Sequence, residues 1–217
     1  MSDVVFLSGW AGAPALFPEI SRRTRFVVPF IGGDEAALVE LAADSGASLL
    51  IGWSTGAHMI VKHAPRLLPL FPRVVLVAPF IRFTDSFPAR LIRSMLARME
   101  REPDATSRDF WKACGFAGPA GWKPEWALPL TEGLRYLLTS QASPKPVAAD
   151  NVTVLHGTAD RIVRPPAMKA VLAALPGAAL IRYEGGHCPD ESVLAPYLEP
   201  AATPRTGTPG HTIPTQP

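Results

Sequence analysis

Short apolar segments alternate with segments of helical periodicity along most of this chain. The apolar segments are rich in Val, Ile and Leu and cover residues 4–7, 25–29, 48–52, 74–78, 152–156 and 179–183. Between them, apolar residues recur three and four positions apart in 34–43, 55–63 and 166–175, a spacing typical of amphipathic helices. Strands that are apolar throughout and separated by helices are usually parallel and buried on both faces. The alternation predicts an α/β fold with a shortened, mostly parallel sheet of about six strands and helices on both faces.

Residues 81–150 interrupt this alternation, because they are rich in Arg, Trp and Pro and contain no convincing strand. Helical spacing predicts one helix from about residue 85 to 102, a second from about 107 to 114 and a third around 130–138. We interpret this segment as a helical lid inserted into the α/β core formed by residues 1–80 and 151–200. Residues 201–217, which offer little to bury, are predicted to be a disordered tail.

Composition limits the classes of protein to which the chain can belong. With 217 residues, 47% of them apolar, it can bury one sizeable core, and a net charge of +2 does not indicate nucleic acid or a membrane surface as a partner. The N-terminus lacks the basic flank and long apolar stretch of a signal peptide, so Cys114 and Cys188 are expected to stay reduced. We therefore expect a cytoplasmic monomer that needs no cofactor.

A Gly-Trp-Ser-Thr-Gly motif at residues 52–56 lies between a predicted strand and a predicted helix. A serine on such a tight turn needs small neighbours two positions before and after it, and Gly52 and Gly56 provide them. The helix that follows points the positive end of its dipole at the serine, which favours a developing negative charge. Although the motif also arises by chance, its position favours Ser54 as a catalytic nucleophile.

An acid and a base follow the last two predicted strands. Asp160 lies just after strand 152–156, and His187 lies in a glycine-flanked loop after strand 179–183. A serine needs an imidazole to take its proton, and the imidazole needs a carboxylate to fix its tautomer and orientation. The order Ser54, Asp160, His187 is the one that the α/β-hydrolase fold uses. Asp85 is the alternative acid, and Asp160 is favoured by its position in the loop.

Two backbone N–H groups are candidates for an oxyanion hole. The first belongs to Thr55, next to the serine, and the second to Trp10, in the loop after the first strand. The Trp10 indole could instead line the acyl pocket or only pack beneath the lid. His58, His63, His156 and the half-buried thiol of Cys188 are interpreted as structural, and no spacing of ligands predicts a metal site.

Three sequence blocks, Gly-Trp-Ser-Thr-Gly at 52–56, Leu-His-Gly-Thr-Ala-Asp at 155–160 and Gly-Gly-His at 185–187, resemble the α/β-hydrolase superfamily. The resemblance extends from the first strand to the helix after His187. The compact size, Trp10 and Trp53 are most similar to the esterases of biotin synthesis that cleave pimeloyl-[acyl-carrier protein] methyl ester, and Phe110-Trp111 in the lid adds a looser likeness. Ser8 stands where the superfamily usually has histidine.

The resemblance implies a serine carboxylesterase that works through an acyl-enzyme, with a pimeloyl-carrier methyl ester as the favoured substrate. A general short-chain esterase or a thioesterase is the alternative within hydrolases. A lyase or haloperoxidase would keep the same three residues, and a non-catalytic binding protein of this fold usually lacks at least one of them.

An acyl carrier protein would be an acidic partner and would need a basic surface beside the pocket. The first lid helix is predicted to carry Arg90, Arg93 and Arg101 on one side and Leu91, Met95 and Met99 on the other. The arginines could bind the carrier or simply be a solvated face. Met95, Met99 and Trp111 are expected to cover the acyl chain.

Overall fold

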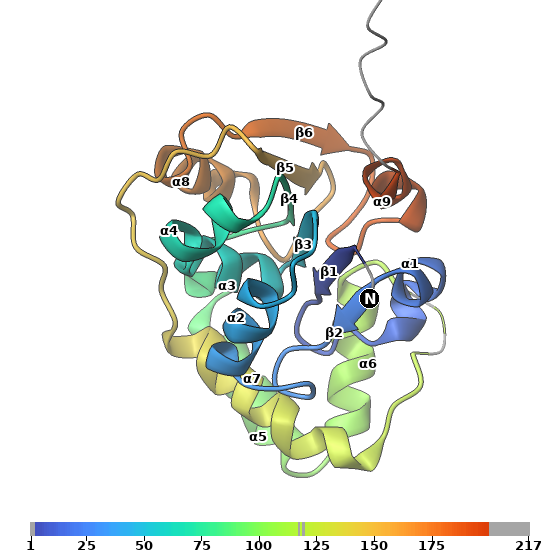
Figure 1. Ribbon diagram of the computed structural model, residues 1–217. Coiled ribbons are helices and arrows are strands. Elements are labelled where there is room, and N and C mark those ends of the chain that lie inside the picture. The colour runs from blue at the N-terminus through green and yellow to red at the C-terminus, as the bar shows by residue number, and fades with distance from the viewer. Residues whose placement is uncertain (1–2, 117, 119, 200–217) are drawn as a thin grey trace, which may run out of the picture.

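The computed structural model of the protein describes residues 3–116, 118 and 120–199, and its centre is one parallel sheet. The six strands lie in the order β2-β1-β3-β4-β5-β6, and all neighbouring pairs are parallel (Figure 1). Each is within a few residues of its predicted position: β1 (Val4–Leu7), β2 (Arg25–Val27), β3 (Leu49–Trp53), β4 (Arg73–Val77), β5 (Val152–Gly157) and β6 (Ala179–Tyr183). The predicted α/β fold with a parallel sheet of six strands is confirmed.

Helices cover both faces of this sheet. In Figure 1, one group lies on one side, made of α2 (Glu35–Ala43), α3 (Thr55–Lys62), α4 (Ala64–Leu67) and α8 (Pro165–Ala174). On the other side lie α1 (Pro18–Arg23) and α9 (Glu191–Leu198). Single turns of 3-10 helix join several elements: η1 (Pro14–Leu16), η2 (Leu68–Leu70), η3 (Phe83–Asp85) and η4 (Pro124–Trp126). The short α1 and α4, each shorter than two turns, were not predicted because so few residues cannot display a helical period.

The central strands form the core. Leu49, Leu50 and Ile51 of β3 are completely buried. Transfer of each of these side chains from water to the core stabilises the fold by roughly 1.5–3 kcal/mol. The edge strand β6 differs, since Ile181 remains 46% exposed. Burial on both faces therefore holds the middle of the sheet in place. Because β1, β3 and β5 are held rigidly, the residues that directly follow them are held in fixed positions as well.

Three longer helices lie between β4 and β5, as predicted for the lid: α5 (Ala89–Met99), α6 (Pro103–Ala113) and α7 (Ala127–Thr139). The helix α5 packs against both α6 and α7, and the three helices lie in the lower part of the molecule in Figure 1. An antiparallel bridge between Arg82 and Gln141 joins the chain entering this insertion to the chain leaving it. Among the described residues of 81–150 no longer strand occurs.

The inner face of α5 differs from the prediction. Leu91 is 42% exposed, and its neighbour Ile92 is fully buried instead, together with Met99. The prediction was wrong by one position because Leu91 and Ile92 are both apolar, so only packing against α6 and α7 decides which of them faces inward. Arg90 and Arg93 are exposed, as expected.

The predicted tail, 201–217, lies outside the described residues, as does residue 200 at the end of the predicted core segment. Within the part of the chain that is described, no helix is both long enough and apolar enough to cross a lipid bilayer.

Candidate active site

Ser54 occupies a strained turn between β3 and α3. Its backbone lies at φ 52° and ψ −109°, a conformation that residues other than glycine rarely adopt. The neighbouring glycines make the turn possible, because a Cβ at Gly56 would lie 2.1 Å from the Leu7 carbonyl oxygen and one at Gly52 would lie 2.7 Å from the Ala57 Cα. The predicted sharp turn and its two close approaches are present.

A chain of hydrogen bonds joins the three predicted catalytic residues. The Ser54 Oγ lies 2.8 Å from the His187 Nε2, and the His187 Nδ1 lies 2.8 Å from the Asp160 Oδ2. Since an ionised carboxylate only accepts hydrogen bonds, Nδ1 carries the proton and Nε2 is left to accept the Ser54 hydroxyl proton. All three side chains are buried, with Ser54 4%, Asp160 6% and His187 1% exposed. The strand order thus brings together residues that are far apart in the sequence.

The environment of Asp160 keeps its carboxylate charged. Burial by itself would raise the pKa of this group, but the adjacent His187 and the N–H groups of Ile162 and Val163 outweigh it, so the pKa lies below its usual value. These N–H groups donate to the Asp160 Oδ1 at 2.8 and 2.9 Å. Both carboxylate oxygens therefore have partners, which fixes the orientation of the group.

The alternative acid, Asp85, is not bonded to His187. It lies in η3 and is exposed to solvent. His156, the last but one residue of β5, donates through its Nε2 to the Val163 carbonyl at 2.9 Å, a buried hydrogen bond of the structural kind that we expected. Among the described residues there is no cluster of three or more His, Cys, Asp and Glu able to hold a metal ion.

The two candidate oxyanion donors adjoin one another. Thr55 is the first residue of α3, so its N–H has no acceptor within the helix. The Trp10 N–H lies 3.2 Å from the Thr55 Oγ1 and donates to it. For the Trp10 N–H to bind an oxyanion, the Thr55 hydroxyl must release it. The Trp10 indole donates to the Leu130 carbonyl of α7 at 2.7 Å, so it packs beneath the insertion.

Two further indoles hold the loops of the site in place. The Trp53 Nε1 donates to the His187 carbonyl at 2.8 Å, and the Trp111 Nε1 donates to the Ala11 carbonyl at 2.8 Å. One bond fixes the loop that carries the histidine, and the other ties α6 to the loop after β1. The sequence marks both residues only as tryptophans within motifs that resemble the family, because no local pattern reveals a partner a hundred or more residues away.

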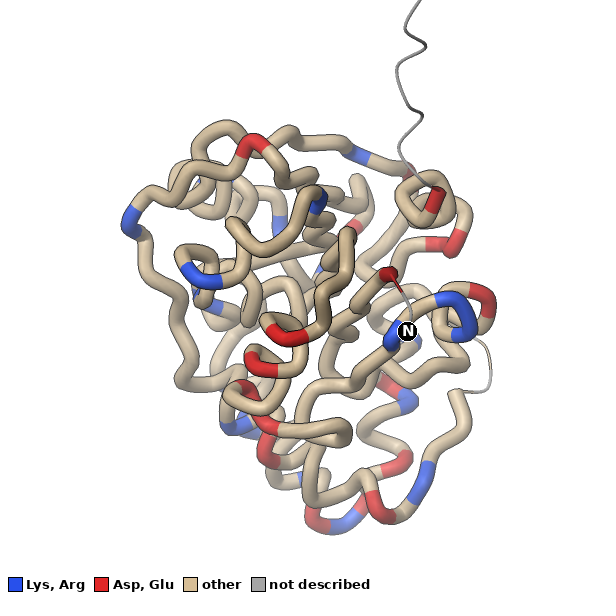
Figure 2. Tube along the Cα trace, in the orientation of Figure 1, with Lys and Arg blue, Asp and Glu red and all other residues tan. Residues whose placement is uncertain are grey.

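The residues of the predicted lid differ in exposure. Met99 and Trp111 are buried and Met95 is half-buried, whereas Arg90, Arg93 and Arg101 are exposed. Arg98 pairs with Asp109 and Glu102, but among the described residues no ion pair involves the three exposed arginines. Figure 2 shows acidic and basic positions interspersed along the helices at the lower end of the molecule.

Comparisons with known proteins identify the family of the chain. The profile of the "Alpha/beta hydrolase family" matches residues 4–202. A search of curated protein sequences finds no match.

Among solved structures, an esterase from Exiguobacterium antarcticum superposes with a TM-score of 0.65 at 15% identity, covering 90% of this chain and 91% of that one. A type II thioesterase from the borrelidin biosynthetic cluster superposes with a TM-score of 0.56 at 16% identity, covering 90% of this chain and 92% of that one. An enol-lactonase from Burkholderia xenovorans superposes with a TM-score of 0.56 at 16% identity, covering 90% of this chain and 87% of that one. These identities show a shared fold, and the profile match over nearly the whole chain shows that the protein belongs to the alpha/beta hydrolase family.

Proposed function

We propose that the protein is a serine carboxylic ester hydrolase that works through an acyl-enzyme. The observation that carries this proposal is the pair of 2.8 Å contacts that joins Ser54, His187 and Asp160 in one chain. A non-catalytic protein of this fold has no need of a buried serine bonded to an oriented imidazole. Similar solved structures include an esterase, a thioesterase and a lactonase, all of which bear names for hydrolytic reactions on acyl groups.

In the proposed reaction, the Ser54 Oγ attacks the ester carbonyl while its proton passes to the His187 Nε2. The carbonyl oxygen becomes an oxyanion, which accepts hydrogen bonds from the N–H groups of Thr55 and Trp10. The imidazolium, stabilised by Asp160, then donates its proton to the leaving alkoxide, and an alcohol departs. Water repeats the two steps and releases the acid.

This proposal is tested by hydrolysis of p-nitrophenyl esters of graded acyl length by the wild-type protein and by Ser54→Ala. We expect activity and labelling by a fluorophosphonate in the wild type, and neither in the variant, with the same circular dichroism spectrum for both. If the wild-type protein is labelled but does not hydrolyse the esters, Ser54 remains the nucleophile and the assignment of these ester substrates is rejected. An unlabelled, folded wild type would favour a binding protein.

For the physiological substrate, we propose a pimeloyl-carrier methyl ester, with an acyl carrier protein as partner. The support is the exposed set of Arg90, Arg93 and Arg101 on the insertion, which form no ion pair with any described residue. The apolar side chains of Met95, Met99 and Trp111 belong to the same insertion. Complementation of a biotin auxotroph tests the substrate. Failure to restore growth by a soluble, esterase-active protein would reject it in favour of a general esterase or thioesterase.

The carrier surface has its own test. Reversal of the three arginines to Glu should weaken turnover of a carrier-linked ester, because the acidic carrier would lose its partner charges. The matched control reverses three exposed cations of the core: Arg25, Lys169 and Arg182. Equal effects of the two triple variants would show that the arginines are only a solvated face.

A further inference from the structure

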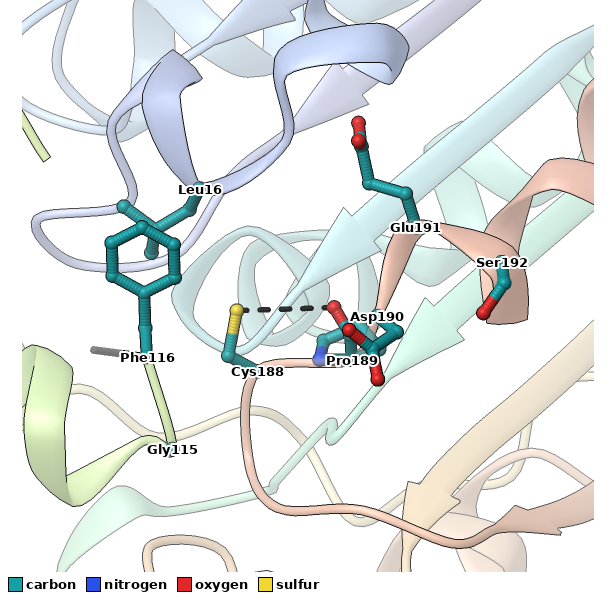
Figure 3. A pocket seen from close by; sticks show the side chains of 8 residues that line it. All are labelled: Leu16, Gly115, Phe116, Cys188, Pro189, Asp190, Glu191 and Ser192. Carbon is teal, nitrogen blue, oxygen red and sulfur yellow. Dashed lines mark hydrogen bonds between the residues drawn. The ribbon is translucent and has the colours of Figure 1, made fainter. Parts of the chain in front are cut away.

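A cavity of about 380 Å³ lies beside the Cys188 sulfur, with Leu16 and Phe116 together on one side of it (Figure 3). Its described lining contains none of the three predicted catalytic residues and neither of the two oxyanion donors. The groups that can act on a substrate at Ser54 are instead the buried polar groups beside that serine.

The Thr55 side chain carries a buried hydroxyl whose proton has no acceptor. Thr55 is completely buried, and its Oγ1 accepts the Trp10 N–H at 3.2 Å. A hydroxyl can accept and donate at the same time. Among the described residues, however, no hydrogen bond has the Thr55 hydroxyl as its donor. Because a buried donor without an acceptor is costly, such a group indicates a partner that arrives during the reaction.

This hydroxyl lies beside both N–H groups of the proposed oxyanion hole. It belongs to the residue that supplies the first N–H, and it contacts the nitrogen of Trp10, which supplies the second. The Thr55 N–H, at the first position of α3, also has no backbone acceptor among the described residues. Three hydrogen-bond donors from two residues are therefore neighbours next to Ser54.

The loop that carries Trp10 is held against Thr55. The Ser8 Oγ donates to the Gly12 carbonyl at 2.7 Å, which closes the loop on itself. A Cβ at Gly12 would lie 2.2 Å from the Ser8 Oγ, so the loop is tight. On the side of α3, the Gly56 N–H donates to the Ser8 carbonyl at 3.0 Å. These bonds fix the Trp10 N–H next to the Thr55 hydroxyl.

An oxyanion that binds the Trp10 N–H must therefore come close to the Thr55 oxygen. Lone pairs of the two oxygens would repel each other, whereas a hydroxyl turned toward the oxyanion donates to it, and hydrogen bonds to a charged acceptor are the stronger ones. We propose that the Thr55 hydroxyl is a third oxyanion donor, which bonds to the carbonyl oxygen of the ester as negative charge develops on it. The proton stays on Thr55. This assignment rests on the proposed function.

Such a donor acts mainly in the transition state. The carbonyl oxygen of the bound ester is a weaker acceptor than the oxyanion, so the hydroxyl stabilises the second more than the first. Loss of the hydroxyl should consequently lower kcat and leave KM nearly unchanged. A hydroxyl that only held the loop in place would have no such selective effect.

The test compares ester hydrolysis by the wild-type protein and three variants. Thr55→Val removes the hydroxyl, keeps nearly the same shape and leaves both N–H groups in place. Thr55→Ser keeps the hydroxyl and removes the methyl group. Thr24→Val is the matched control, because it removes a buried hydroxyl that donates to the Ile20 carbonyl at 2.9 Å in a different part of the fold. Circular dichroism checks the fold of each.

We expect Thr55→Val to lower kcat about 10²-fold, the scale of a lost oxyanion donor. Thr55→Ser and Thr24→Val should stay close to the wild type. A trifluoromethyl ketone, which adds to the Ser54 Oγ and forms a hemiketal oxyanion, should bind Thr55→Val more weakly by a similar factor. If Thr55→Val does not fold, Thr55→Ala takes its place, since it also lacks the hydroxyl and adds no bulk.

Several results would overturn the proposal. An unchanged kcat in Thr55→Val would show that the hydroxyl does not bind the oxyanion, and a raised kcat would show that it only competes for the Trp10 N–H. Equal losses in Thr55→Val and Thr55→Ser would assign the effect to packing of the methyl group. All three leave the esterase itself intact. Absence of hydrolysis and of Ser54 labelling in the folded wild type would instead overturn the proposed function, and the third donor with it.

Discussion

His58 should make the stability of the protein fall steeply in mild acid. Its imidazole is completely buried, and the Nδ1 donates to the Phe80 carbonyl while the Nε2 lies 2.9 Å from the Ser140 Oγ, so the neutral ring accepts the hydroxyl proton. Burial lowers the pKa of His58 from 6.5 to about 4. The charges of Lys62 and His63 also lower this pKa, and the Phe80 carbonyl and Glu35 partly oppose them.

The sign and size of the effect follow from linkage. Between pH 6.5 and pH 4 the unfolded chain binds a proton at this residue that the folded chain does not, so the free energy of unfolding falls as the pH falls. At about 1.4 kcal/mol per pKa unit, the loss reaches roughly 2 kcal/mol by pH 5 and about 3 kcal/mol by pH 4. This loss is a large fraction of the free energy of unfolding, which is typically about 5–15 kcal/mol for a folded domain.

The measurement is urea denaturation of the wild-type protein and of His58→Gln at about pH 7 and pH 5. Glutamine can still donate to the Phe80 carbonyl, but it has no proton to gain. The wild type should lose about 2 kcal/mol more than the variant between the two pH values. His63→Gln, which leaves the buried ring in place, should keep most of the wild-type loss. Equal losses in the wild type and in His58→Gln would refute the reasoning.

Other changes give sharp outcomes. Asp160→Asn should keep the fold but lower kcat by about 10⁴, because the amide favours the wrong tautomer of His187; a stopped-flow or steady-state ester assay checks this, and near-normal kcat would contradict it. Gly56→Ala should yield insoluble or unfolded protein, since its Cβ would lie 2.1 Å from the Leu7 carbonyl oxygen; a cooperative thermal transition like that of the wild type would show the turn to be adaptable. Trp111→Phe removes the indole bond to the loop after β1 and should cost about 1 kcal/mol in urea denaturation, together with faster hydrogen exchange in α6; unchanged exchange would show that packing alone holds this helix.

Local patterns predicted much of the fold. The six strands were found because each buried strand is a run of Val, Ile and Leu bounded by polar or glycine-rich turns. The long helices were found because their apolar residues repeat over several turns. On the inner face of α5 only Leu91 was misassigned, since Leu91 and Ile92 are both apolar and the sequence does not show which of them the neighbouring helices cover.

The sequence by itself determined the residue types and the positions of the acid, the base and the serine relative to their strands. Because parallel strands end at one edge, that information was enough to predict that Ser54, Asp160 and His187 meet.

Only the tertiary structure decided which long-range partners these groups find. The bond from the Trp53 indole to the His187 loop and the bond from the Trp10 N–H to the Thr55 hydroxyl depend on packing between distant segments. The cavity beside Cys188 arises likewise, where the end of α6 meets the loop before α9. Such contacts have no local signature, because a side chain's partner across the fold is set by the arrangement of the whole core rather than by its sequence neighbours.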